Sequence, residues 1–600
     1  MALPTPASDI PPAPPAPGLR GRVDRIDDEV VRDVMAMVDA SPLVATVEEW
    51  RAEERRGPGG RPETFPVRAL LVAMVLCPGT GYPVLATAMA GVLFRRISPT
   101  MRHELGVPTP PGRLDVHGQL AAYRNVRTRL HALLGLMDPS PTPKNRRLDP
   151  ATYAARLAER QAAHTEEEWA ERARRLEWFI NQVIEMSLQT QPREIRRRWK
   201  GNSAVDATVV PTFARPDRRL QRKKRGEAPE VQVHSADPDG DWYVRNPTEG
   251  KPDGEPDRAY WGYEASLIVS GSDDPSRPQT FPSLVMGMAT LHKPGRYPGR
   301  QAVRALASVH DRGHPARLLA GDRAYSSAKP EDFQLPVRAL GYQPVFDYKV
   351  DQLGIQGSYN GMLQVEGAWY CPAIPKVLIE ATIDYRKGAV DEPTYKARLA
   401  ERWKYLVLSK EGPDPEGHVR LRCPASDPSP VARCDLKPTS VRPSTQGRLR
   451  IPVTAAVTDH PPPICTQQSV TVPPEAGAKF AQPLLYGSDE WQATYATLRS
   501  TNEGMNGYLK DGAREALGDP QRRRIRGVAA QSVFVALQLC AANLRKIDSF
   551  LVRVAAEAAG MARRRPRRRR TRALDEWLPE PPPSPTPVTG GPGPDPPTAA

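Results

Sequence analysis

A run of alternating strand and helix patterns between residues 202 and 349 constrains the fold of this chain more than any other feature. Five segments in it have the short, apolar, β-branched or aromatic composition of strands: NSAVDATVV, YWGYEASLIVSG, FPSLVMGMATL, ARLLAGDRAYSS and QPVFDYKV. Helix patterns separate the third segment from the fourth and the fourth from the fifth. The resulting order, β-β-β-α-β-α-β, predicts an α/β fold with five strands and flanking helices.

Two aspartates interrupt this apolar pattern. Asp206 lies in the middle of the first strand segment, and Asp322 lies just beyond the fourth. A carboxylate inside a strand is unfavourable and costly to bury alone, so its presence needs a reason. A strand-end turn or a buried ion pair is the ordinary explanation. Two aspartates that meet on adjacent strands would instead suit a pair of hard cations, which bind oxygen ligands and clamp both reacting oxygens of a phosphodiester.

A second constraint is an amphipathic helix predicted over residues 488–512. Ser488 is a suitable N-cap, with two acidic residues in the first turn. Within this helix Arg499, Glu503 and Lys510 are four and then seven residues apart, which places them on one stripe. Such a stripe is either a surface ladder of ion pairs or a metal-binding carboxylate between two phosphate-binding cations.

Composition divides the chain into seven parts. These are a Pro/Ala-rich leader (1–22), a helical domain (23–138), a linker with helices (139–200), the first part of the core (201–349), a β-rich insertion (350–486), the second part of the core with the Glu503 helix (487–560), and a basic, then Pro-rich tail (561–600). The leader and the tail are expected to be disordered. In the helical domain, Arg124, Arg127 and Arg129 form a basic helix that suits DNA binding, although a packing or dimerisation domain is an equally good interpretation.

The charge balance favours a polyanionic partner. The chain has 84 Lys and Arg against 69 Asp and Glu, a formal net charge of +15, although a basic tail alone can produce such a bias. The N-terminus lacks a signal-peptide pattern, and the longest apolar runs considered fall short of the roughly 20 residues that a membrane span needs. We therefore expect a cytoplasmic protein.

Six cysteines in 600 residues do not form a disulfide framework. Four of them lie in the insertion: Cys371, Cys423, Cys434 and Cys465. They have no CxxC spacing, and no histidines cluster with them, so ordinary reduced thiols are favoured over a structural zinc site, which stays open.

With these residues in view, the chain resembles an insertion-sequence transposase of the DDE class. The subgroup concerned has a β-rich insertion in an RNase H-like domain and a Tyr-x2-Arg-x3-Glu-x6-Lys signature. The Arg-x3-Glu-x6-Lys spacing matches at Arg499, Glu503 and Lys510. The signature tyrosine would fall at Ala496, but the tyrosine of this chain is Tyr495.

The resemblance implies an RNase H-like core with a mixed five-stranded sheet. It also implies that three carboxylates are catalytic and bind two Mg²⁺ ions, which Mn²⁺ can replace: Asp206, Asp322 and Glu503. Arg499, Lys510 and Tyr495 would contact DNA.

The implied activity is cleavage at transposon ends followed by attack of the freed 3′-hydroxyl on target DNA. Its partner would be double-stranded DNA, bound by a homodimer in the nucleoid. Two alternatives remain: a domesticated endonuclease without strand transfer, and a noncatalytic DNA-binding protein.

Overall fold

The computed structural model describes residues 25–55, 64–108, 116–219, 230–244, 259–277, 279–453 and 455–560. It forms two compact units, Met1–Asp548 and Ser549–Ala600, and the elements below belong to the first unit except for the end of the last helix. The leader and the basic, Pro-rich tail inferred from the sequence lie outside the described residues.

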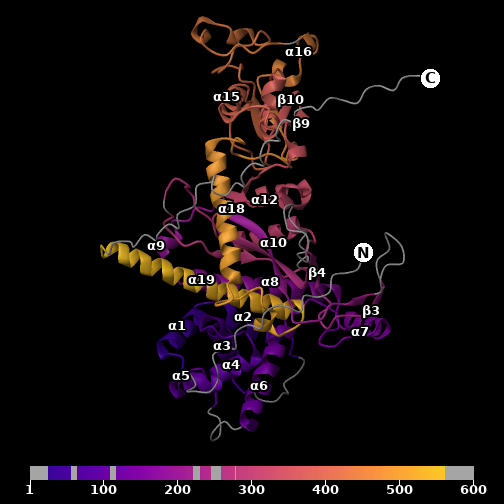
Figure 1. The fold of residues 1–600 in the computed structure, drawn as a ribbon, viewed down its shortest axis with the longest axis vertical. Coiled ribbons are helices and arrows are strands. Elements are labelled where there is room, and N and C mark those ends of the chain that lie inside the picture. The colour runs from indigo at the N-terminus through magenta and orange to yellow at the C-terminus, as the bar shows by residue number, and fades with distance from the viewer. Residues whose placement is uncertain are drawn as a thin grey trace, which may run out of the picture. The chain divides into compact units, whose positions relative to one another are not determined.

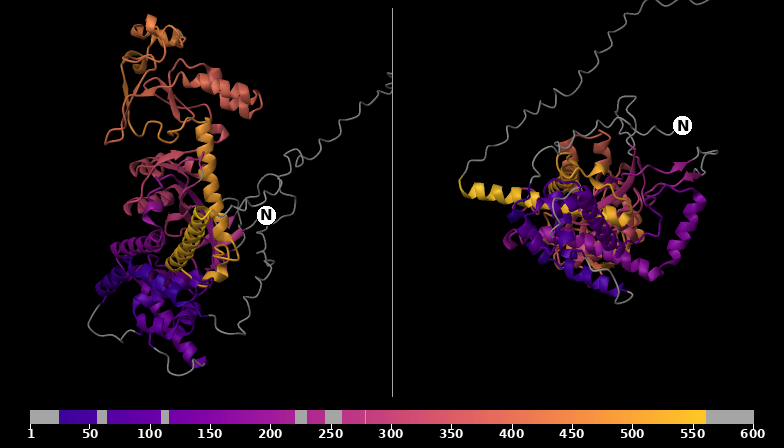
Figure 2. Two further views of the ribbon diagram at one scale, coloured as in Figure 1. Left: turned by 90° about the vertical axis from the view of Figure 1, so that its left-hand side faces the viewer. Right: turned by 90° about the horizontal axis from the view of Figure 1, so that it is seen from below.

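A group of helices forms the N-terminal region (Figures 1 and 2). Its members are α1 (Asp28–Asp39), α2 (Leu43–Glu53), α3 (Val67–Gly79), α4 (Ala86–Gly91), α5 (Pro99–Glu104) and α6 (Val116–Gly135), with a π-helical turn at Val92–Arg96. Helix α3 is apolar nearly all round, and it is buried because α1, α2, α4 and α6 all contact it. The helices predicted for this region are therefore present.

Three further helices lead into the sheet: α7 (Pro150–Ala162), α8 (Glu166–Leu188) and α9 (Arg193–Arg196). A capping box between Thr165 and Glu168 begins α8. The second half of α8 is buried, and it contacts the edge of the sheet.

The central sheet has six strands: β1 (Ser203–Pro211), β4 (Asp241–Val244), β5 (Ala259–Ser270), β6 (Val285–Met288), β7 (Leu318–Ala320) and β8 (Gln343–Val345). Their order is β4-β5-β1-β7-β8, and β6 pairs with β5 beside β4. Strand β5 is antiparallel to β1, whereas β7 is parallel to β1 and β8 is parallel to β7. The molecule is thus a mixed α/β protein with a mixed sheet and flanking helices.

The prediction of five strands is wrong by one. Strand β4 lies in a basic stretch that shows no strand pattern over most of its length, but its four residues, DWYV, include two aromatic side chains that favour a strand. Trp242 lies opposite Trp261 of β5, with the rings edge to face at 5.9 Å. The same stretch holds a separate ribbon of β2 (Arg218–Arg219) and β3 (Val231–Val233).

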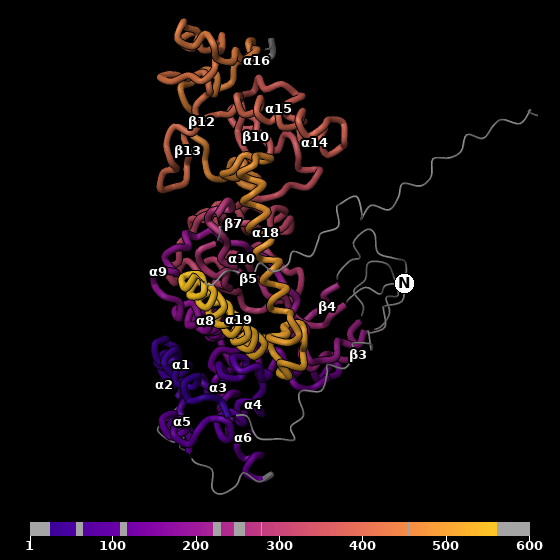
Figure 3. The backbone as a smooth tube through the Cα atoms, turned by 60° about the vertical axis from the view of Figure 1, so that its left-hand side comes forward, coloured from indigo at the N-terminus to yellow at the C-terminus, as the bar shows by residue number. Residues whose placement is uncertain are grey.

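Helices cover both faces of the sheet: α10 (Pro298–Asp311), α11 (Arg323–Ser326), α12 (Gln334–Ala339), α18 (Asp489–Lys510) and α19 (Val528–Ala558), with a 3₁₀ turn at Pro330–Asp332. Ala204 and Ala320 pack against Leu498 of α18, which runs beside β1, β5 and β7 (Figure 3). On the other face, Gly287 of β6 lies against Val309 of α10.

Two asparagines satisfy the backbone of strand β6. Asn543 of α19 accepts from the N–H of Val285 and donates to its carbonyl. Asn181 of α8 makes the same pair of bonds with Met288. The strand therefore has protein partners at both of these positions.

The insertion contains both strands and helices: β9 (Ile355–Tyr359), β10 (Met362–Val365), β11 (Ala368–Tyr370), α13 (Lys376–Ile379), α14 (Ala381–Arg386), α15 (Glu392–Trp403), β12 (Leu408–Ser409), β13 (Val419–Arg422), α16 (Ala455–Asp459), α17 (Pro463–Thr466) and β14 (Val470–Val472). The strands form two antiparallel three-stranded sheets. Between them lies a buried apolar cluster. The β-rich description from the sequence is incomplete, since the helical segments are also part of this region.

Helix α19 is the one helix in the described ranges that is long and apolar enough to cross a membrane. Its most apolar window is 89 % buried within the structure. That burial is typical of a core helix.

Candidate functional site

The two predicted aspartates lie on neighbouring strands, in a place that we call the strand-end site because Asp322 follows the end of β7. The parallel register pairs Ser203 with Leu319 and Ala204 with Ala320. Two residues further along, the same offset brings Asp206 beside Asp322. Asp206 lies in the middle of β1, Asp322 follows the end of β7, and α18 covers the face to which Ala204 and Ala320 point. Strands β1 and β7 are thus neighbours, as predicted, and the charge of Asp322 acts on Asp206.

The charges of the two aspartates act on each other. Burial, and then the charge of Asp322, raise the pKa of Asp206 from its ordinary 3.8 to about 6. The N–H of Ala207 and the charges of Arg499 and Lys510 oppose this rise. The two cations of the α18 stripe are therefore close enough to Asp206 to stabilise its ionised form.

Asn506 is a site residue that the sequence did not single out. Its Nδ2 donates to Asp206 Oδ2 at 3.0 Å, while Asp206 Oδ1 accepts from the N–H of Ala207 at 2.9 Å. Its own Oδ1 is buried and has no hydrogen-bond partner within the described part of the chain. The helix period could have predicted its place in the site, because residue 506 is three positions after Glu503 and so lies on the same helical stripe.

Glu503 does not contact either aspartate in this structure. Its side chain is 60 % exposed, and Oε1 accepts from Arg499 Nε at 3.2 Å, one helical turn away. The ladder interpretation therefore describes the observed contacts of Arg499 and Glu503. No three His, Cys, Asp or Glu side chains in the described ranges form a ready-made metal-binding group. The stripe nevertheless places Glu503 one turn from Asn506, which reaches Asp206.

Tyr495 supports the turn that carries Asp322. Its hydroxyl lies 3.5 Å from the carbonyl oxygen of Gly321, and its ring stacks on Trp491 at 5.5 Å. The side chain is partly buried at this position. In the structure, Tyr495 holds the end of β7 against α18.

Asp347 is the centre of a second group of charged and polar side chains, which no sequence pattern predicted. Following the register of β7 with β8 by two residues brings Asp347 beside Asp322. Its carboxylate accepts from Arg323 at 2.5 Å, from Arg386 of the insertion at 3.0 Å, and from the Tyr486 hydroxyl at 2.7 Å. Burial raises its pKa, but these donors, led by Arg323, outweigh burial and lower the pKa below its usual value. Asp347 thus links the Asp322 turn to the insertion.

Glu264 is a further buried acid near the strand-end site. It lies opposite Val209, whose side chain alternates to the face away from Asp206. The N–H of Gly295 donates to it at 2.9 Å. Burial raises the pKa of Glu264, and the charge of Asp206 adds to the rise. Its register assigns Glu264 to the face away from Asp206, although the charges of both Asp206 and Asp322 act on it.

The predicted basic helix is α6. Arg129 donates to the carbonyl of Phe65 at 2.5 Å and therefore helps to hold the helical group together. Arg124 and Arg127 are exposed on the same helix. These two side chains are available to a charged partner.

The residues of the strand-end site fit a hard divalent cation. Two carboxylates repel each other there, and the buried Asn506 oxygen without a partner lies beside one of them. Carboxylate and amide oxygens are the ligands that Mg²⁺ and Mn²⁺ prefer. Comparison of the chain with family models, curated proteins and solved structures gave no match.

Proposed function

We propose that this chain is a DDE-class transposase that cuts transposon ends and joins the freed 3′-hydroxyl to target DNA. The observation that carries the proposal is the strand register that brings Asp206 of β1 beside Asp322 after β7, under a helix that supplies two cations. The strand order also supports an RNase H-like core. Strand β5 is antiparallel to both β1 and β6, and β7 and β8 extend the sheet in parallel on the other side of β1.

Asp206 and Asp322 would hold the divalent cations, with Asn506 as an additional oxygen donor and Glu503 as the third carboxylate. When bound, two Mg²⁺ ions supply an activated water and charge stabilisation of the leaving 3′-oxygen. Asn506 orients the Asp206 carboxylate for this task. Tyr495 fixes the Gly321 carbonyl and so limits movement of Asp322.

Arg499 has two alternative partners in this proposal. In the structure it binds Glu503. A DNA phosphate at the site would compete for the same guanidinium, which suits phosphate through its planar fork. The exchange frees the Glu503 carboxylate to turn toward Asp206. Lys510, at the last turn of α18, adds a point charge beside the same phosphate.

The remaining functional features follow from the same class. Double-stranded DNA is the partner, through α6 and the α18 stripe, and a homodimer would bring two ends together. The location is the cytoplasmic nucleoid. The net charge of +15 supports a polyanionic partner.

The test is cleavage of duplex DNA carrying the sequences that flank the gene, in Mg²⁺, read at nucleotide resolution. Asp206→Asn and Asp322→Asn should each lower the cleavage rate by on the order of 10³-fold or more, because several kcal/mol of charge stabilisation is lost. Glu503→Gln should also lower it strongly. Glu490→Gln, an exposed acid on the same helix, is the matched control and should cut normally.

Binding and product analysis complete this experiment. The inactive variants should still shift the DNA in gels, because the phosphate contacts remain. Full cleavage by Asp206→Asn or Asp322→Asn would refute the site. Products that are cut but never joined to a second duplex would instead identify a nuclease without strand transfer.

A further inference from the structure

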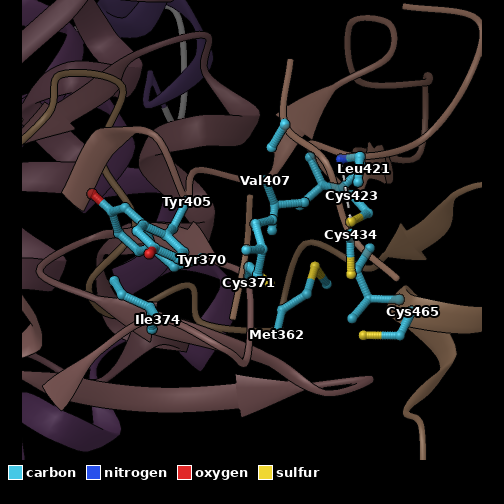
Figure 4. Packing of buried hydrophobic residues seen from close by; sticks show 14 of the residues in the cluster. Met362, Tyr370, Cys371, Ile374, Tyr405, Val407, Leu421, Cys423, Cys434 and Cys465 are labelled. Atoms are coloured by element: carbon cyan, nitrogen blue, oxygen red, sulfur yellow. Dashed lines mark hydrogen bonds between the residues drawn. The ribbon is translucent and has the colours of Figure 1, made fainter. Parts of the chain in front are cut away.

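The four cysteines of the insertion lie in one buried apolar cluster. Cys371, Cys423, Cys434 and Cys465 all belong to the buried cluster between the two small sheets (Figure 4). Each is at most 5 % exposed. They are 52, 11 and 31 positions apart in the chain, and each comes from a different turn or short helix. The fold therefore gathers residues that the sequence spacing leaves unconnected.

The four thiols lie within electrostatic reach of one another. The pKa of the Cys371 thiol is raised first by burial and then by each of the other three. Burial and the thiols of Cys423 and Cys434 raise the pKa of Cys465 to about 12. These interactions show that the Cys371 side chain lies near the other three cysteines of the cluster.

Three of the sulfurs accept a hydrogen bond from a backbone N–H two residues later. The N–H of Ala425 donates to Cys423 Sγ at 3.5 Å, and the corresponding contact occurs at Cys371 and Cys434. The tripeptide Cys-Pro-Ala occurs at both 371–373 and 423–425. Hydrogen bonds of this kind stabilise a thiolate and fix its direction, as the supporting contacts of metal ligands do.

A cation also stands beside the cluster. The charge of Lys437 acts on the thiols of Cys423, Cys434 and Cys465. Its Nζ donates to the carbonyl of Gln467 at 2.6 Å, which fixes the ammonium group near the cluster. Four thiolates around a divalent cation carry a net charge of −2, and Lys437 offsets part of it.

We propose that the insertion binds one Zn²⁺ ion through Cys371, Cys423, Cys434 and Cys465. Four thiolates without an oxygen or nitrogen ligand select zinc among the common divalent ions and favour tetrahedral coordination. Binding forms four Zn–S bonds and releases the thiol protons to solvent. In the structure the thiols are packed but not converged on one point, so their side chains turn inward when the metal binds.

This zinc site would have a structural role. Cys371 follows β11, Cys423 follows β13, and Cys465 lies in α17. One ion would therefore tie the β9–β11 sheet to the β12–β14 sheet and to α17. The insertion also supplies Arg386 to Asp347, so the bound zinc stabilises the region that contacts the strand-end site.

The experiment measures metal in the full chain purified under reducing conditions. Elemental analysis should find one zinc ion per chain. Cobalt substitution should give the sulfur-to-metal charge-transfer absorption of a thiolate site, which a cobalt ion on carboxylates does not produce. Cys423→Ala and Cys465→Ala should each weaken zinc binding by at least about 100-fold, the upper end of what loss of a mere supporting contact costs.

The controls are Cys77→Ala and Cys540→Ala, which are also buried cysteines but lie in α3 and α19. Both should keep the zinc and the cobalt spectrum. If the cluster variants fail to fold, the cobalt spectrum of the wild-type chain decides the question. Absence of charge-transfer absorption, disulfides among these cysteines, or equal zinc in all four variants would overturn the proposal.

Discussion

The strand-end site and the cysteine cluster both collect side chains from distant parts of the chain, but they differ in chemistry and in exposure. Asp206 and Asp322 carry hard carboxylate oxygens and are partly exposed, and the charges of Arg499 and Lys510 act on Asp206. The cysteines of the cluster are buried among apolar side chains, with Lys437 and backbone N–H groups as polar neighbours. The first site suits ions that exchange together with DNA, and the second suits an ion that stays. An open site serves turnover, whereas a closed one serves stability.

The largest effect should come from removing metal at each site. Mild chelation should abolish cleavage, and added Mg²⁺ should restore it, because the open site exchanges its ions. Stripping zinc by acid or by thiol-modifying reagents should instead lower the free energy of unfolding by several kcal/mol, since the closed ion is part of the folded insertion. Calorimetry with parallel metal analysis checks both. Loss of both metals at the same rate under mild chelation would remove the contrast.

The connection between the two regions can be broken at Asp347. Asp347→Ala leaves Arg323 and Arg386 without their shared carboxylate, and we expect a loss of about 2 kcal/mol in the free energy of unfolding. The value is below that of a fully buried pair because the Arg323 side chain is 51 % exposed. Urea denaturation measures it. Asp351→Ala, an exposed acid nearby, should have no measurable effect, and equal losses in both variants would contradict the role of Asp347.

Without bound metal, the buried charge of Asp206 should destabilise the folded protein. Asp206→Asn removes a buried charge beside Asp322 and should stabilise the chelator-treated protein by about 2 kcal/mol at pH 8. The folded-state pKa of Asp206 is about 6, above its ordinary 3.8. The destabilisation by Asp206 is therefore absent below 3.8, grows as the pH rises, and is complete above about 6.

Thermal unfolding of the wild type and Asp206→Asn across this pH range gives the answer. The difference between the two should shrink as the pH falls below about 6. A constant difference at all pH values would show that charge repulsion is not its cause.

The smallest effect concerns the exposed side of α18. A Cβ added at Gly504 would meet no other atom within 4 Å. Gly504→Ala should therefore stabilise the helix by about 0.5–1 kcal/mol through backbone entropy. If this face approaches DNA, the same change should weaken DNA binding, measured by fluorescence anisotropy. Greater stability with unchanged binding would place the DNA elsewhere along the stripe.

The strand-end site was more predictable than the cysteine cluster because it rests on regular elements. Asp206 was predictable because an acid inside an apolar strand contradicts the local pattern, and Asp322 because it comes just after another apolar strand. The Arg499–Glu503–Lys510 stripe followed from the period of the helix. Periodicity could not decide between the two partners of Glu503, because both lie within reach of one rotatable side chain.

The features that could not be predicted from sequence patterns depend on irregular backbone or on long-range contacts. The four insertion cysteines come into one cluster through turns whose geometry has no period in the sequence. Strand β4 has only four residues and gains its stability from β5 across the sheet. Asp347 draws its partners from three separate elements, which no local pattern connects. In each case tertiary contacts, and not local propensity, determine the outcome.

The asparagine pairs on β6 have a consequence for self-association. Exposed strand edges invite another chain to extend the sheet by main-chain pairing. Asn181 and Asn543 already occupy the backbone groups of Met288 and Val285 that an incoming strand would use. Two copies of this chain would therefore not associate by β-augmentation at this edge, and any contact between them would use another surface.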